Sequence, residues 1–115
     1  YEVVYKSGKK ATGNLPVDFV KRMGSAGAGE IVLTVVDREC TWQGYDIELI
    51  KQVTDAVTIP VIVNGGAGSL AHLTQAVKEG KAWGLALGSM VVYQKKGMGV
   101  LINFPPRTEL EKILI

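Results

Sequence analysis

Two glycine-rich segments, each placed directly after an apolar run, are the residues of this chain best suited to bind an anion. Asn64-Gly-Gly-Ala-Gly-Ser69 follows the run Ile59–Val63, and Gly88-Ser89 follows the run Ala82–Leu87. Glycine lets backbone N–H groups approach an anion closely, and the N-terminus of a following helix adds a positive dipole. The residues that we predict to hold a phosphate are Gly65, Gly66, Gly88 and Ser89.

The glycine loop has two other interpretations. A tight strand-to-helix turn that needs positive φ would use the same glycines without a ligand. Gly66-Ala-Gly-Ser-Leu-Ala71 also fits the dinucleotide pattern GxGxxG/A, which requires an acidic residue about 20 positions further on. Gly88 and Ser89 stand at that place. We therefore expect no nicotinamide or other cofactor, and a phosphate shared by paired loops instead.

Further polar residues lie at the end of the apolar run Glu30–Val36. Asp37 and Glu39, in the polar loop Asp37–Gly44, could act on a substrate hydroxyl, and Thr34 could hydrogen-bond to one. A solvated loop without a role in binding is the alternative. Cys40 has no histidine nearby in the sequence, so we expect neither a thiol nucleophile nor a metal site. We interpret His72 as an ordinary histidine near a helix N-terminus.

Alternating strands and helices must position these residues. Continuous apolar runs are typical of strands buried on both faces of a parallel sheet, and each run here precedes a segment with helical periodicity. Such alternation predicts βαβ units.

The expected strands are Tyr1–Tyr5 and Ala11–Leu15, forming a hairpin, then Glu30–Val36, Ile59–Val63 and Ala82–Leu87, with Val100–Phe104 extended. The expected helices are Pro16–Gly24, one from about Asp46, one capped by Ser69 and ending near Lys78, and a last one opened by the capping box Thr108–Glu111.

Composition excludes several classes of protein. Hydrophobic residues make up 47% and charged residues 21% of the chain, as in a globular domain. A net charge of +2 gives no reason to expect a nucleic-acid partner, and no apolar run is long enough to span a membrane. The single cysteine excludes an internal disulfide framework. We expect one cytoplasmic α/β domain over residues 1–115.

The number of strands suggests an incomplete barrel. A (βα)₈ barrel takes about 250 residues, and this chain has 115. We therefore expect a partial TIM-type barrel, about its C-terminal half, with parallel strands, flanking helices and an N-terminal hairpin. Such a sheet has two open, apolar edges, which a second copy in a homo-oligomer or a missing N-terminal half would cover.

Several segments resemble a known family in order and spacing. These are Tyr5-Lys-Ser-Gly-Lys-Lys-Ala-Thr-Gly13, Gly27-Ala-Gly-Glu-Ile-Val-Leu-Thr34, Asp37-Arg-Glu39, Gly44-Tyr-Asp46 and Pro60-Val-Ile-Val-Asn-Gly-Gly-Ala-Gly68. They resemble the cyclase subunit of imidazole glycerol phosphate synthase, a lyase of histidine biosynthesis. The resemblance runs from Tyr1 to about Val92, and the tail is more similar to the branch of polysaccharide biosynthesis.

The resemblance implies a cyclase that takes ammonia from a glutaminase partner and closes an imidazole ring on a bis-phosphorylated substrate. It implies phosphate contacts at Gly65, Gly66, Gly88 and Ser89, and substrate contacts at Thr34 and Glu39. The two catalytic aspartates of the family belong to strands that this chain lacks, so no residue here is assigned a catalytic role. Cys40 replaces a glycine of the family, so we expect an altered loop backbone, because a Cβ disfavours positive φ.

Two functional hypotheses follow. In the first, the chain is the C-terminal half-barrel of a cyclase-like protein that binds a phosphorylated substrate and is catalytically incomplete alone. In the second, it is a free-standing half-barrel that binds phosphate or self-assembles without catalysing a reaction.

Overall fold

Three short parallel strands form the centre of the fold in the computed structural model, which describes all residues 1–115. They are β3 (Ile31–Thr34), β4 (Val61–Asn64) and β5 (Gly84–Leu85), in the order β3-β4-β5. All three run in the same direction. Their carboxyl ends therefore meet at one edge of the sheet, and the loops that follow them are neighbours.

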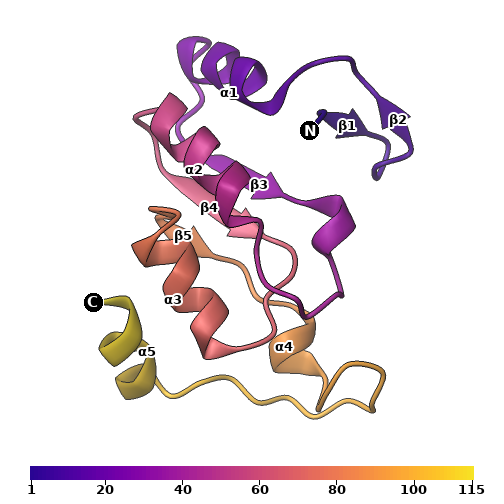
Figure 1. Cartoon of the computed structure of the whole chain (residues 1–115), viewed down its shortest axis with the longest axis vertical. Coiled ribbons are helices and arrows are strands. Elements are labelled where there is room, and N and C mark those ends of the chain that lie inside the picture. The colour runs from indigo at the N-terminus through magenta and orange to yellow at the C-terminus, as the bar shows by residue number, and fades with distance from the viewer.

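Three helices alternate with these strands, as the sequence predicts. They are α1 (Pro16–Ser25), α2 (Ile47–Ala56) and α3 (Leu70–Lys78), and Figure 1 shows α2 and α3 in front of the sheet. The core lies between these helices and the sheet. Its most deeply buried large side chains are those of Ile50, Val53, Val61, Val63 and Leu73.

Local sequence signals place the starts of the three helices. Pro16 occupies the first turn of α1, where its missing N–H breaks no hydrogen bond. The Asp46 carboxylate accepts a hydrogen bond from the Leu49 N–H at 3.1 Å and caps α2. The Ser69 hydroxyl likewise accepts from the His72 N–H at 3.4 Å and caps α3. The predicted starts at Pro16, Asp46 and Ser69 are confirmed.

The two faces of the sheet differ, which corrects one prediction. Val61 and Val63 are each 1% exposed, whereas Val32 is 62% exposed. The interpretation of Glu30–Val36 as a strand buried on both faces is therefore wrong. Helices cover one face only, and side chains alternate along a strand, so every second residue of β3 is left open.

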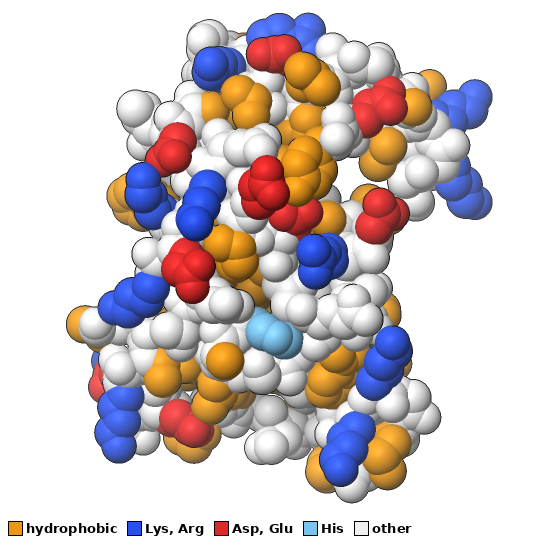
Figure 2. All heavy atoms as spheres, in the orientation of Figure 1, with side chains coloured by type: hydrophobic (Ala, Val, Ile, Leu, Met, Phe, Trp, Pro, Cys, Tyr) orange, Lys and Arg blue, Asp and Glu red, His pale blue; other side chains and the backbone are white.

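The N-terminal hairpin is shorter than predicted. Its strands are β1 (Val4–Tyr5) and β2 (Lys10–Ala11), and they pair antiparallel. In Figures 1 and 2 the hairpin extends from the body as an arm. A large groove of about 820 Å³ lies between the hairpin, α1 and β3, and 14 of its 22 lining residues are hydrophobic.

The C-terminal tail has the predicted extended segment but departs from prediction in its two helices. The short helix α4 (Ser89–Val92) is followed by an extended segment in which the Leu101 N–H donates to the Val92 carbonyl at 2.9 Å. Helix α5 (Arg107–Leu114) then packs on α3. The predicted capping box at Thr108 does not form, because Pro106 precedes the first turn and Thr108 already lies within it. No helix is long and apolar enough to cross a membrane.

Candidate functional site

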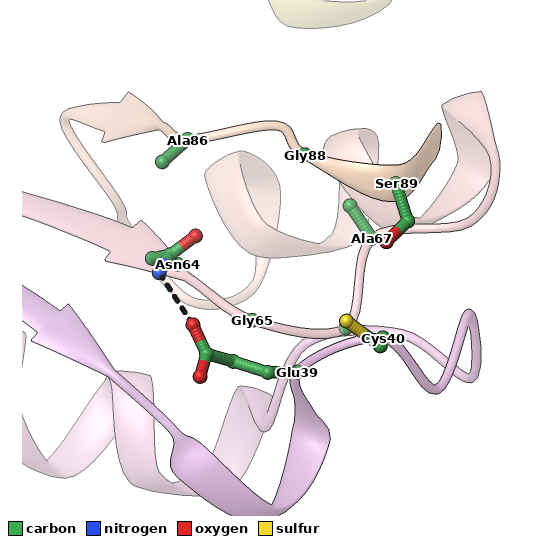
Figure 3. Close-up of a pocket in the computed structure, with 9 residues that line it drawn as sticks. Glu39, Cys40, Asn64, Gly65, Ala67, Ala86, Gly88 and Ser89 are labelled. Carbon is green, nitrogen blue, oxygen red and sulfur yellow. Dashed lines mark hydrogen bonds between the residues drawn. The ribbon is translucent and has the colours of Figure 1, made fainter. Parts of the chain in front are cut away.

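A pocket of about 90 Å³ lies at the carboxyl ends of the strands, where three strand-to-helix loops meet (Figure 3). The β4–α3 loop contributes the glycines, the β5–α4 segment contributes Gly88 and Ser89, and the β3–α2 loop contributes Glu39. Five of the six predicted site residues therefore lie together. The lining consists of Glu39, Cys40, Asn64, Gly65, Gly66, Ala67, Ala86, Gly88 and Ser89.

The glycine loop packs backbone against backbone on the loop before it. Gly65 and Gly66 have φ values of 101° and 108°, in the left-handed region that favours glycine. A Cβ on Gly66 would lie 2.2 Å from the Gly44 carbonyl oxygen, and one on Gly65 would lie 2.8 Å from the Val35 oxygen. The glycines are thus required by the turn and its packing, whether or not a ligand binds.

The same packing leaves hydrogen-bond donors free at the pocket. The Gly66 carbonyl accepts from the Gly44 N–H at 2.7 Å, but the N–H groups of Gly65, Gly66 and Ser89 have no acceptor within the protein. The Ser89 hydroxyl makes no hydrogen bond either, and its side chain extends toward the glycine loop in Figure 3. Adjacent free N–H groups in a glycine loop that leads into a helix, as the loop of Gly65 and Gly66 leads into α3, suit an anion.

The opposite side of the pocket carries a small polar network. The Asn64 Nδ2 donates to Thr34 Oγ1 at 3.3 Å and to Glu39 Oε1 at 3.4 Å. Thr34 and Asn64 are partners in the sheet register, which explains their contact. Thr34 lies outside the pocket lining and reaches the pocket through Asn64. Asp37, in the short 3₁₀ helix Val36–Arg38, lines the large groove instead.

Two residues that sequence reasoning did not select hold the loops in place. The Tyr45 hydroxyl donates to the Ala86 carbonyl at 2.9 Å and so fixes the segment before Gly88. Tyr45 is 5% exposed, and its burial raises its pKa to about 12. His72 accepts from the Gly68 N–H through Nδ1 at 3.1 Å. Nothing in the composition of these segments distinguished Tyr45 or His72 from ordinary core and surface residues.

Cys40 lies on the pocket wall with a φ of 61°. The cysteine therefore occupies the left-handed region despite its Cβ. No cluster of three or more histidine, cysteine, aspartate or glutamate side chains is arranged to bind a metal.

Parallel strands followed by helices, with glycine loops at the strand ends, define an α/β protein of the class that places its ligands at the carboxyl edge of the sheet. Residues 1–97 match the family model described as "Histidine biosynthesis protein", and the chain belongs to this family. The resemblance to the cyclase subunit is confirmed by curated relatives.

The relatives come from two Leptospira species, and both are provisionally named imidazole glycerol phosphate synthase subunit HisF. The protein of Leptospira borgpetersenii is 43% identical over 113 residues, and that of Leptospira interrogans is 40% identical over 113 residues. Each alignment covers 98% of this chain but 44% of the relative. The chain thus spans less than half the length of the curated relatives it matches.

Proposed function

We propose that this chain is the C-terminal half-barrel of a cyclase-like protein and that its pocket binds the phosphate group of the substrate. The observation that supports the proposal is the convergence of three unpaired backbone N–H groups, from Gly65, Gly66 and Ser89, on one small pocket. The Ser89 hydroxyl adds a fourth donor. The proposed substrate is a phosphorylated small molecule, as the name of the curated relatives, imidazole glycerol phosphate synthase subunit, suggests.

The donors of the pocket suit a phosphate better than a carboxylate. A phosphate monoester presents three acceptor oxygens, which can accept from donors on two different loops at once. Helix α3 has nine residues, and its capped N-terminus follows the glycine loop directly, so its dipole favours negative charge there. Gly88 has no atom within 4 Å of its Cβ position, which leaves room for a ligand beside it.

Ring closure belongs to the whole protein rather than to this chain. General acid–base chemistry needs positioned groups of suitable pKa. The resemblance implies that the family's catalytic aspartates lie on strands outside this chain, which covers 44% of its relatives. We therefore propose that this half binds and orients one phosphate, that a glutaminase supplies ammonia to the complete cytoplasmic enzyme, and that this chain alone does not close the ring.

Ser89→Asp tests the phosphate site. A carboxylate at this position would repel the phosphate and occupy its place, so binding of glycerol phosphate to the chain should weaken at least about tenfold, which corresponds to 1.4 kcal/mol. Thr58→Asp is the matched control, because Thr58 is exposed and distant from the pocket lining. Isothermal titration calorimetry measures both. Equal binding by the two variants, or no binding by the unaltered chain, would contradict the proposal.

The second hypothesis, a self-assembling module, is favoured by a different observation. Strand β3 has no partner on one edge, and the groove beside it is mostly apolar. Val32, which lines the groove, is 62% exposed. A second copy, or the remaining half of the barrel, would cover this surface.

A further inference from the structure

The segment that carries Ser89 has little structure of its own. Ser89 begins α4, which has only four residues, none of them fully buried, and a helix of this length is not stable by itself. The Tyr45 hydroxyl holds the stretch before Gly88 through its hydrogen bond to the Ala86 carbonyl. The other end of the segment, at the last residues of α4, needs a second attachment.

The extended tail supplies this attachment. The Leu101 N–H donates to the Val92 carbonyl at 2.9 Å, and the Asn103 N–H donates to the Val91 carbonyl at 2.9 Å. The last carbonyls of a helix have no partner within the helix, so these two bonds satisfy groups that would otherwise lack a partner in the chain. Figure 1 shows the tail passing α4 on its way to α5.

The turn between α4 and the tail determines which tail residues face the helix. Tyr93 and Val100 form an antiparallel bridge, and successive N–H groups of an extended backbone point to opposite sides. Leu101 and Asn103 therefore donate to α4, whereas the N–H of Ile102, between them, has no acceptor within the protein.

The tail contacts α4 through its backbone more than through its side chains. Leu101 is 54% exposed, Ile102 is 79% exposed, and Asn103 is also exposed. Side chains that remain so exposed contribute little to a core. The main contribution of these residues to the fold is therefore the pair of main-chain hydrogen bonds to α4.

We propose that Leu101 and Asn103 are positioning residues of the phosphate pocket and that they act through their backbone N–H groups. By holding the end of α4, they keep Ser89 opposite the glycine loop, so that donors from two loops reach one phosphate. This inference rests on the proposed phosphate-binding function. It adds to that function a part of the chain that lies outside the pocket lining.

Proline substitution tests the inference, because it removes a single backbone N–H. Leu101→Pro deletes the bond to Val92, whereas the matched control Ile102→Pro deletes an N–H that has no acceptor. An extended segment accommodates proline where the N–H is not bonded. In calorimetric titration with glycerol phosphate, we expect at least about tenfold weaker binding by Leu101→Pro and unchanged binding by Ile102→Pro. Asn103→Pro should repeat the loss and is the second variant if Leu101→Pro does not fold.

A double variant shows whether the tail acts through Ser89. Ser89→Ala alone should weaken binding about tenfold, because it removes a hydroxyl donor from the pocket. In the double variant Leu101→Pro/Ser89→Ala, the second change should weaken binding by less than about twofold, because the hydroxyl is already displaced. A purely structural role predicts a lower melting temperature for Leu101→Pro and losses of affinity that multiply in the double variant.

The outcomes separate the two proposals. If the unaltered chain binds glycerol phosphate and Leu101→Pro binds it equally well, the inference about the tail is overturned while phosphate binding stands. Equal losses in Leu101→Pro and Ile102→Pro, multiplying losses in the double variant, or unfolding of both Leu101→Pro and Asn103→Pro would also overturn it. If the folded, unaltered chain binds no glycerol phosphate at millimolar concentration, both proposals fail.

Discussion

Gly66 illustrates how one residue can serve packing and binding together. No side chain fits at this position, because a Cβ would lie 2.2 Å from the Gly44 oxygen. The close approach binds two loops through the hydrogen bond from the Gly44 N–H, and it leaves the Gly66 N–H without an acceptor beside the pocket. The backbone conformation that forms the turn therefore also leaves the Gly66 N–H free to donate to a ligand.

Gly66→Ala should therefore destabilise the fold. The new methyl group meets a backbone carbonyl and the residue retains positive φ, so we expect the free energy of unfolding to fall by at least about 2 kcal/mol. Urea denaturation followed by circular dichroism measures the change. Gly99→Ala is the control, because nothing lies within 4 Å of its Cβ position and its φ is not in the left-handed region. Comparable losses in the two variants would contradict the argument.

Cys40 offers the opposite experiment. Its φ of 61° is unfavourable for a residue with a side chain, and Cys40→Gly should relieve the strain. We expect the free energy of unfolding to rise by about 0.5 to 1 kcal/mol, after the greater freedom of glycine in the unfolded chain is included. Cys40→Ser keeps the Cβ and removes only the thiol. A similar rise in that variant would show that the backbone conformation is not the cause.

At the scale of elements, the sequence predicts helices better than strands. Helix starts depend on local groups such as Asp46 and Ser69, and both caps form as predicted. The strands of the sheet are shorter than their apolar runs. Only those residues that lie opposite a residue of a neighbouring strand take part in the pairing. The last helix shows the limit of local patterns, since Pro106 sets its start ahead of the capping box at Thr108.

Some residues of the candidate site could likewise be predicted from the sequence, and others could not. The glycines and Ser89 could be predicted, because their loops follow successive parallel strands and must share one edge. Tyr45 and His72 could not, because their roles arise from contacts with Ala86 and Gly68, which only the folded chain brings near. Asp37 was a candidate for contact with a substrate hydroxyl, but it lies in the 3₁₀ helix Val36–Arg38 and lines the large apolar groove rather than the pocket.

Tyr45 links the loop before α2 to the end of β5, and its ionisation should report on that link. The unfolded chain ionises this tyrosine near pH 10, whereas burial raises the folded pKa to about 12. Its contribution to stability is complete below pH 10 and is lost as the pH rises toward 12. Compared with Tyr45→Phe, the unaltered chain should lose about 1 kcal/mol of unfolding free energy between pH 9 and pH 11.

Tyr45→Phe should also lower the free energy of unfolding at neutral pH. Phenylalanine leaves the Ala86 carbonyl without its partner, so Tyr45→Phe should be less stable by about 1 to 2 kcal/mol at pH 7. Denaturant unfolding at a series of pH values measures both effects. Parallel pH profiles for the two proteins would show that Tyr45 is accessible to solvent and that the proposed link is weak.

At the scale of the whole molecule, the main feature is the face of the sheet that no helix covers. It leaves Val32 exposed beside a groove of about 820 Å³ that is mostly apolar. Exposed apolar surface next to an unpaired strand edge is a site for association. The half-barrel interpretation and the self-assembly hypothesis both predict that this surface becomes covered in the functional protein.

Val32→Lys tests association through this face. We expect the isolated chain to sediment as a dimer at tens of micromolar, and a buried, unpaired lysine should reduce the association constant at least about tenfold. Ile102→Lys is the control, because Ile102 is 79% exposed in the tail and does not line the groove. A monomer at every concentration would exclude self-assembly. Equal effects of the two substitutions would place the contact elsewhere.

The pocket built from three successive loops also has a thermodynamic consequence. Its walls exist only while β3, β4 and β5 are paired, so an unfolded chain offers no such site. A ligand present at 100 times its dissociation constant would then add about 2.7 kcal/mol to the free energy of unfolding. With 15 of 115 residues buried, the sheet has a small core, and total stabilities of domains are about 5 to 15 kcal/mol. Binding of the proposed phosphorylated ligand would therefore raise the free energy of unfolding by an amount that is large relative to what the small core supplies.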